Sequence, residues 1–213
     1  MEMIKKVIVI GLGNISLRHR RNLKSLLPDV YIIAIPASGK ITSQNVEFSD
    51  QISLSLNSVI QDNIDMAIVA SPATLHCEHA KALMNAGIPT LIEKPITSNI
   101  LDAKELIKIY KDTHTPTAVA YCLRYMPATI KMKELLDRSE IGNIYNAFIE
   151  VGQYLPDWHP WEDVKDFYVS QKEISACREI VPFELTWIAD ILGPVKNAFA
   201  FYGKTMDVGA DID

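Results

Sequence analysis

The sequence predicts an α/β protein whose N-terminal Rossmann domain, with a doubly wound parallel sheet, occupies residues 1–122. Short apolar runs alternate with helical segments in this half, which is typical of parallel strands covered on both faces. A glycine-rich turn follows the first apolar run and opens a helix. Residues 123–213 depart from this alternation. They predict part of an α+β substrate or oligomerisation domain with an open, mainly antiparallel sheet.

The first domain is expected to alternate strands and helices along the chain. Strands are predicted at residues 6–10, 30–35, 64–70, 89–92 and 117–121, and helices at 14–27, 53–60, 72–86 and 98–112. The strands are continuous apolar runs, whereas the longer helices carry apolar residues on one face. Gly87 marks the end of the helix at 72–86, because glycine favours that position.

The second domain is predicted to begin with a helix. A helix at 127–139, a strand at 145–154, an aromatic loop at 155–168, a helix at 182–192 and a strand at 195–202 are expected. Pro182 is expected near a helix start, because a proline inside a helix removes a hydrogen bond. Two strands make a poor sheet alone. Partner strands are therefore expected either from another subunit, which would give a homo-oligomer, or from chain beyond Asp213.

Composition narrows the class of protein. The chain has 213 residues, of which 48% are hydrophobic and 22% charged, so it can bury a core without disulfides or a structural metal. The net charge of −5 argues against nucleic acid or an anionic membrane surface as the main partner. Three widely spaced cysteines do not resemble a disulfide framework. The first apolar run is too short for a signal peptide or a membrane span, so a soluble, cytoplasmic protein is expected.

The glycine-rich turn predicts a dinucleotide site. Gly11 permits a tight turn after the first strand, and Gly13 lets the backbone approach a pyrophosphate. The pyrophosphate would then lie at the helix start, on Asn14 and Ile15. Ser16 takes the third position of the motif, where a small side chain still allows close packing of helix on strand.

The end of the second strand bears on the choice of cofactor. An acidic residue that would bind the adenosine ribose is absent there. Ser38 and Lys40 stand in its place and would suit a 2′-phosphate, which favours NADP over NAD. The alternative is an ordinary polar loop.

Glu93, Lys94 and Pro95 follow a short strand, at the edge of the sheet where ligands bind. A lysine there can act as a general acid or base, and Glu93 would orient it or lower the cost of its charge. The alternative is a surface lysine. By contrast, His76 and His79 lie one helical turn apart but lack a partner pair elsewhere, so no metal site is predicted.

The sequence resembles the Gfo/Idh/MocA oxidoreductase family along nearly its whole length. The resemblance is carried by GLGNIS (11–16), SPATLHCEHA (71–80), EKP (93–95) and VAYCLRYMP (119–127). It implies NAD(P)-dependent hydride transfer at a sugar or polyol carbon, with Lys94 near the reacting hydroxyl and the nicotinamide. It also implies that Ser71, Pro72 and His76 border the nicotinamide, that Glu93 lies beside its ribose, and that Tyr121 and Arg124 border the substrate pocket.

The second domain departs from this family. The family's glycine-rich turn and catalytic histidine have no counterpart in residues 175–185, where Glu184 takes the place of the histidine. Glu184 would exchange a proton if burial raised its pKa, or would bind a substrate amine or hydroxyl. The alternative is a charge on a partly exposed helix. Trp158 and His159 in the aromatic loop would form a sugar-stacking wall with a replacement acid, or a core edge or subunit contact.

The sequence thus predicts an NADP- or NAD-dependent oxidoreductase of a carbohydrate or sugar-derived substrate. Two alternatives stay open. One is a reductase of a non-sugar substrate. The other is a nucleotide-binding protein that is truncated or impaired in catalysis, since family members run well past 300 residues.

Overall fold

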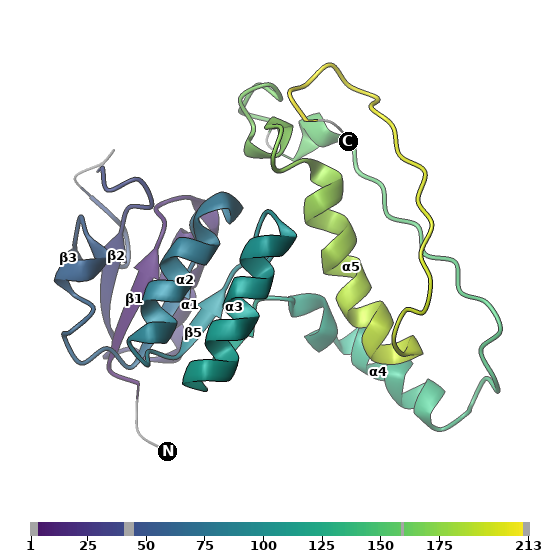
Figure 1. Ribbon diagram of the computed structural model, residues 1–213, viewed down its shortest axis with the longest axis horizontal. Helices are drawn as coiled ribbons and strands as arrows, with labels where there is room; N and C mark the ends of the chain where they lie inside the picture. Colours follow the sequence, from purple (N-terminus) through teal and green to yellow (C-terminus); the bar gives the residue numbers. More distant parts are fainter. Residues whose placement is uncertain (1–3, 41–44, 159, 211–213) are drawn as a thin grey trace. The chain divides into compact units, whose positions relative to one another are not determined.

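The computed structural model describes residues 4–40, 45–158 and 160–210 (Figure 1). It divides into two compact units, Met1–Ala120 and Tyr121–Asp213. Within the described residues, no helix is both long and apolar enough to cross a membrane.

The first unit is built on one parallel sheet of six strands in the order β3-β2-β1-β4-β5-β6. The strands are β1 (Lys6–Ile10), β2 (Tyr31–Ile35), β3 (Gln51–Ile52), β4 (Met66–Val69), β5 (Thr90–Ile92) and β6 (Thr117–Val119). The chain starts in the middle, runs out to one edge and then returns to the other side of β1. The order reverses between β1 and β4, where open α/β sheets bind ligands beyond the carboxyl ends of the strands. The predicted Rossmann fold is therefore confirmed.

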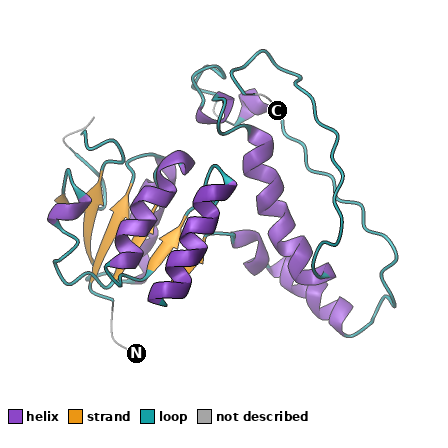
Figure 2. Ribbon diagram, viewed as in Figure 1, coloured by secondary structure: helices purple, strands orange, loops and turns teal. Residues whose placement is uncertain are grey.

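Helices cover both faces of this sheet, as Figure 2 shows. They are α1 (Asn14–Leu26), α2 (His76–Asn85) and α3 (Ile100–Thr113). Ile8 and Ile10 of β1 point to the face that packs on Leu83 of α2, whereas Val7 and Val9 point to the face that packs on α1. All four side chains are fully buried, and each such burial contributes roughly 1.5–3 kcal/mol.

Three details of the first unit differ from the sequence prediction. The two-residue strand β3 was not predicted, because it is too short for an apolar pattern. The helix expected at 53–60 is a single 3₁₀ turn, Leu56–Ser58. The helix expected at 72–86 begins with the 3₁₀ turn Ala73–Leu75 and becomes α-helical at His76.

The second unit consists of helices, short 3₁₀ turns and long irregular segments. Its main helices are α4 (Pro127–Asp137) and α5 (Ala176–Leu192). A small apolar cluster joins Leu155, Phe167, Val169 and Ile174, and Trp158 packs against it. The aromatic loop and the residues that follow it up to Ile174 thus share a small apolar core.

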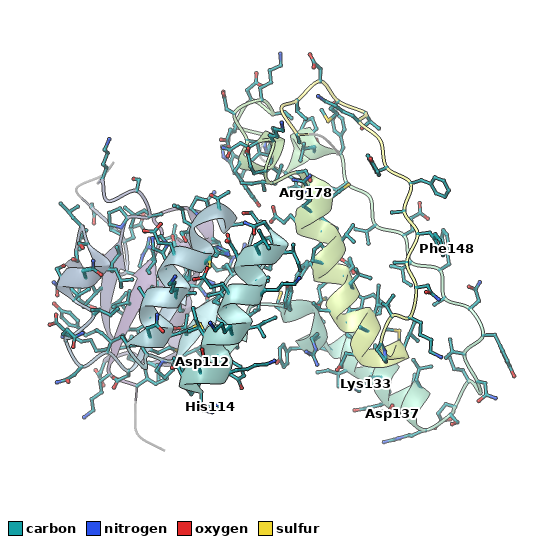
Figure 3. The ribbon with its side chains drawn as sticks, viewed as in Figure 1. Asp112, His114, Lys133, Asp137, Phe148 and Arg178 are labelled. Carbon is teal, nitrogen blue, oxygen red and sulfur yellow. The ribbon has the colours of Figure 1, made fainter. Side chains whose placement is uncertain are left out.

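The strands predicted at 145–154 and 195–202 are not formed. Both segments lack strand pairing throughout, so no sheet is present among the described residues of this unit (Figure 1). A strand is defined by hydrogen bonds to a neighbouring strand, and an alternating apolar pattern does not supply one. The apolar side chains are accordingly exposed: Phe199 is 94% exposed, and Phe148, labelled in Figure 3, is 85% exposed.

Helix α5 begins six residues earlier than predicted, so Pro182 lies inside it. Ser175 caps the helix, and its hydroxyl oxygen accepts a hydrogen bond from the Arg178 amide at 3.1 Å. Glu179 anchors the first turn, because its carboxylate accepts the single proton of the Tyr168 hydroxyl, whose oxygen lies 2.6 and 2.5 Å from the two carboxylate oxygens. These contacts offset the one hydrogen bond that the proline removes.

Candidate functional site

The turn after β1 requires glycine at its first position. Gly11 has a φ of +111°, and a Cβ atom built there would lie 2.2 Å from the Ala70 carbonyl oxygen. The Gly11 amide donates to the Ile35 carbonyl at 2.7 Å. Gly11 therefore joins the ends of β1, β2 and β4 in a space that no other residue fits.

The start of α1 fits a phosphate. Gly13 is its N-cap, and a Cβ atom there would meet nothing within 4 Å. No side chain caps this end, and no acidic residue lies in the first turn. The amides of Asn14 and Ile15 therefore face outward at the positive end of the helix dipole, which suits an anion. Ser16 is fully buried, and its hydroxyl donates to the Gly13 carbonyl at 2.7 Å.

A buried arginine supports this turn and was not predicted. Arg20 is 2% exposed, its Nε donates to the Glu47 carbonyl at 2.9 Å, and its Nη1 donates to the Gly11 carbonyl at 3.3 Å. Burial lowers the pKa of Arg20 below its usual value. One feature of the sequence indicates that Arg20 faces inward: it lies four residues after the small Ser16, on the same face of α1.

A hollow of about 200 Å³ lies at the end of β2. Its lining includes Pro36 and Gly39 after β2, and Glu78 and His79 from α2. Ser38 and Lys40 were predicted to hold the adenosine end of the cofactor. Both are exposed, and both are adjacent in the sequence to Gly39, which lines the hollow. Glu78 was not predicted. It brings to the hollow, from α2, the carboxylate that the end of β2 lacks.

The segment after β5 lies at the same edge of the sheet, because parallel strands end together. Glu93 is 8% exposed, and its Oε1 lies 2.7 Å from Nε2 of His19 on α1. Its Oε2 accepts from the Lys94 amide at 3.1 Å. Lys94 is half-buried, and its peptide bond to Pro95 is cis. The contact of His19 was not predicted.

His76 joins the segment after β4 to the Glu-Lys-Pro segment after β5. His76 is 1% exposed, with Nε2 2.7 Å from the Ser71 carbonyl and Nδ1 2.9 Å from the Pro95 carbonyl. The Ser71 hydroxyl contacts Nδ1 of His79 at 3.0 Å, and Pro72 is exposed. Burial lowers the pKa of His76 and of His79. Ser71 and His76 are thus brought to the Glu-Lys-Pro segment.

In the second unit, two predicted substrate residues contact α5. The Tyr121 ring lies 6.3 Å from the Phe183 ring. Arg124 Nη2 lies 2.6 Å from Oδ1 of Asp190, and Lys133 Nζ lies 2.9 Å from the other carboxylate oxygen. Hydrogen bonding to Lys133 is the largest influence that lowers the pKa of Asp190, and the charge of Arg124 adds to it.

The remaining predicted residues of this unit lie on α5 and in the aromatic loop. Glu184 is half-buried, and its Oε2 accepts a hydrogen bond from the Trp187 indole at 2.6 Å. Trp158 packs edge to face on Phe167, with ring centroids 6.0 Å apart. Its buried indole nitrogen has no partner among the described residues. His159 lies outside the described residues.

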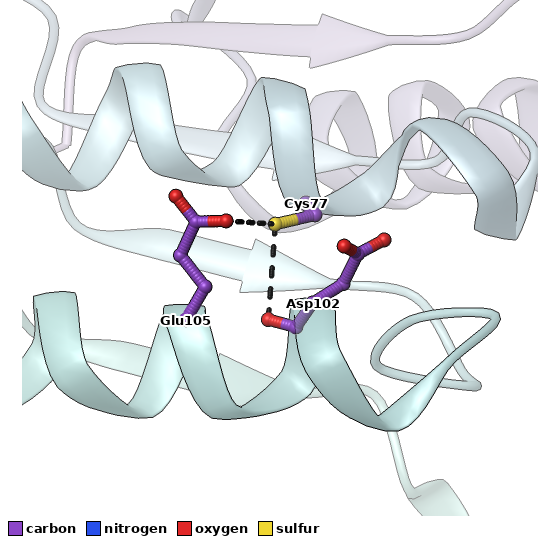
Figure 4. Close-up of side chains that lie close together, drawn as sticks. All are labelled: Cys77, Asp102 and Glu105. Carbon is purple, nitrogen blue, oxygen red and sulfur yellow. Dashed lines mark hydrogen bonds between the residues drawn. The ribbon is translucent and has the colours of Figure 1, made fainter.

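One cluster elsewhere has the residue types of a metal site. Cys77 on α2 faces Asp102 and Glu105 on α3, and their candidate ligand atoms lie within 4.8 Å of one another (Figure 4). The thiol lies 3.7 Å from the Asp102 carbonyl and 3.9 Å from Glu105 Oε2, and Lys81 pairs with Glu105. Burial raises the pKa of Cys77, which favours the thiol over a metal-binding thiolate. The cluster is a contact between two helices.

Comparison with known proteins shows the family to which the chain belongs. A family model described as "Oxidoreductase family, NAD-binding Rossmann fold" matches residues 5–121, which is more than half of the chain. The chain belongs to the Gfo/Idh/MocA oxidoreductase family. The matched part contains the glycine turn, the hollow and the Glu-Lys-Pro segment.

Curated members of the Gfo/Idh/MocA family resemble part of the chain. The scyllo-inositol 2-dehydrogenase (NAD⁺) of Bacillus subtilis is 26% identical over 146 residues, which cover 67% of this chain and 43% of that protein. The D-xylose 1-dehydrogenase (NADP⁺) of Hypocrea jecorina is 29% identical over 93 residues, which cover 44% of this chain and 24% of that protein. The chain thus spans less than half the length of these relatives.

A solved structure resembles nearly the whole chain. An oxidoreductase from Agrobacterium radiobacter, in complex with NAD⁺, L-tartaric acid and magnesium, superposes with a TM-score of 0.79. The match covers 98% of this chain and 61% of that one, at 15% identity. At this identity the likeness shows a shared fold alone.

Proposed function

We propose that the protein is an NAD(P)-dependent oxidoreductase that acts on a sugar or a sugar-derived polyol. The observation that carries the proposal is the position of Lys94 after β5, at the sheet edge where the glycine-rich turn follows β1, in a segment joined to α1 by the contact between Glu93 and His19. Family membership supports the cofactor class. The names of the curated relatives, an inositol and a xylose dehydrogenase, support the substrate class.

The residues of the first unit would divide the work as follows. Gly11, Gly13, Asn14 and Ile15 would hold the pyrophosphate, and Glu93 would lie beside the nicotinamide ribose. The bound cofactor would supply hydride transfer to or from the substrate carbon. Lys94 would accept the proton of the substrate hydroxyl when the substrate is oxidised, and would donate it when the substrate is reduced.

The substrate side of the proposal is assigned to the second unit. Tyr121, Arg124, Trp158 and His159 are proposed to line the pocket, and Glu184 is proposed to assist the proton transfer. The charge of Arg124 is shared with Asp190, so this side chain suits neutral hydroxyls better than a strongly anionic substrate.

The choice of cofactor depends on the hollow at the end of β2. Ser38 and Lys40 favour the 2′-phosphate of NADP, whereas Glu78 repels a phosphate and favours the ribose hydroxyls of NAD. We therefore propose NADP or NAD, with exposed Lys40 as the feature that admits NADP. A cytoplasmic location remains part of the same proposal.

The test combines a nucleotide titration with one substitution. Fluorescence titrations with NADH and NADPH are expected to show binding, and their relative affinities identify the cofactor. Lys94→Ala is expected to lower kcat by roughly 10²–10⁴-fold, the range for loss of a general acid or base, and to leave nucleotide affinity nearly unchanged. Lys104→Ala, which removes an exposed lysine of α3, is the matched control.

Each outcome is informative. Normal turnover by Lys94→Ala would remove this lysine from the mechanism, and failure to bind either nucleotide would overturn the dinucleotide site. Nucleotide binding with no turnover of any sugar or polyol would favour two alternatives. They are a binding protein without catalysis and a reductase of a non-sugar substrate, which a panel of carbonyl compounds separates.

We further propose that the segments 145–154 and 195–202 take up partner strands and form a homo-oligomer. Their alternating apolar side chains and unpaired backbone support this, because such a surface is a ready edge for strand addition.

A further inference from the structure

The carboxylate of Glu93 connects helix α1, which follows the glycine-rich turn, to Lys94. One of its oxygens contacts His19, which lies on the helix that the glycine turn opens, and the other accepts from the amide of Lys94. The side chains of His19 and Glu93 are only 17% and 11% exposed. A partly buried contact of this kind fixes the orientation of Glu93 more firmly than a contact on the surface would.

A second histidine holds the other side of the same segment. His76 is fully enclosed, and its ring lies between the carbonyl oxygens of Ser71 and Pro95, at 2.7 and 2.9 Å. Ser71 follows β4 and Pro95 lies three residues beyond β5, so the ring spans the loops after two neighbouring strands. A neutral ring donates one hydrogen bond at a time, and its tautomer decides which carbonyl accepts it.

Lys94 lies between these two attachments. The residue before it is held by His19 and the residue after it by His76, so the backbone of Lys94 is fixed from both directions. The direction in which its Cα–Cβ bond points follows from that backbone. The reach of its amine toward a substrate therefore depends on the two side chains that make these attachments.

We propose that His19 and His76 are positioning residues for Lys94. His19 acts through the Glu93 carboxylate, and His76 acts through the Pro95 carbonyl. The inference rests on the proposed role of Lys94 in proton transfer and adds two residues to it. A displacement of about 1 Å at a reacting group can lower a rate by roughly 10²-fold, which sets the size of the expected effect.

The main test replaces His19 in the full chain. His19→Leu is expected to lower kcat by roughly 10²-fold, with the KM of the substrate changed by no more than about two-fold. His19→Gln places an amide near the original Nε2 atom and is expected to restore most of the rate. Arg21→Leu removes an exposed residue of the same helix and is the matched control.

A second readout does not depend on turnover. The Lys94 amide donates to Glu93, so release of Glu93 in His19→Leu is expected to speed hydrogen exchange at this amide by roughly ten-fold, the equivalent of one lost hydrogen bond. His19→Gln is expected to keep the slow rate. Equal exchange rates in wild type and His19→Leu, with equal melting temperatures, would overturn the proposal for His19.

A double-mutant cycle tests the route through Glu93. If His19 acts only through this carboxylate, His19→Leu adds little to the loss already caused by Glu93→Gln. Fully additive losses would contradict the proposed route. For His76, the pair His76→Asn and His76→Leu is compared in the same two assays. His76→Asn keeps a donor toward Pro95 and is expected to retain more activity and slower exchange at Lys94 than His76→Leu.

Failure of the proposed role of Lys94 and failure of the positioning role of His19 give different results. If Lys94→Ala retains normal turnover, the proposed function of Lys94 fails whatever the histidine variants do. If Lys94→Ala is inactive while His19→Leu keeps both its kcat and its slow amide exchange, the proton-transfer role stands and the positioning role of His19 is wrong.

Discussion

Apolar side chains in strand-like patterns are buried in the first unit and exposed in the second. In the first unit, Val7–Ile10 of β1 are 0% exposed, with paired strands on both sides and helices on both faces. In the second, Tyr145 is 91% and Phe199 is 94% exposed, and the backbone on which they lie has no strand partner. The difference shows that an apolar pattern measures the tendency of a segment to pair. Pairing itself depends on a second segment within reach.

The largest expected difference between the units lies in hydrogen exchange. Amides inside β1 and β4 are expected to exchange only through opening of the sheet, roughly a thousand-fold or more slowly than amides in 145–154 and 195–202. Exchange measured by mass spectrometry on the full chain at low concentration tests this.

The same measurement, repeated at several protein concentrations, shows where partner strands for the second-unit segments come from. If the second-unit segments become protected as the protein concentration rises, and the molecular mass by light scattering rises in parallel, partner strands come from another copy. Protection at all concentrations in a monomer would show that the two segments pair within the chain.

The next largest effect is expected from truncating one side chain in each unit. Ile33→Ala, at a fully buried position of β2, should lower the free energy of unfolding by about 2–5 kcal/mol. Phe199→Ala removes a larger side chain but changes exposed surface only, so an effect within about 0.5 kcal/mol is expected. Urea unfolding of both variants provides the test. A loss of more than about 2 kcal/mol for Phe199→Ala would show that this side chain is buried in solution.

Sequence and structure agree where one segment determines its own structure. Gly11 and Gly13 were recognisable because a tight turn and a helix start have local rules. The same holds for β1, β2 and β4, whose apolar runs are continuous. The early start of α5 was not predicted, because the rule against proline outweighed the cap at Ser175 and the anchor at Glu179.

The rest of the candidate site depends on contacts between residues far apart in the sequence. His19 lies 74 residues from Glu93, and His76 lies 19 residues from Pro95. No local pattern encodes such pairs. The basic character of His19 and Arg20 gave no indication that both side chains point inward. Glu78 was not predicted either, because the dinucleotide motif places the carboxylate at the end of β2, whereas Glu78 lies on α2.

The smallest expected effect, and the one that separates the units by pH, comes from the histidines. All described histidines lie in the first unit, since His159 is outside the described residues. Burial lowers the pKa of His76 and His79, so near pH 6 the unfolded chain binds more protons than the folded one. Stability of the first unit is therefore full above the unfolded value of about 6.5 and falls as the pH drops from there toward the folded pKa.

The carboxylates act in a separate range. The Lys5 and Lys6 amides, which donate to Asp65, lower the pKa of that carboxyl group, so its contribution is lost only below about pH 4. Urea unfolding between pH 7.5 and 5 thus isolates the histidines. His76→Asn is expected to flatten the dependence, whereas His114→Asn, at an exposed left-handed position that asparagine tolerates, should not. If both variants keep the wild-type slope, carboxylates and not the buried histidines control the acid sensitivity of the first unit.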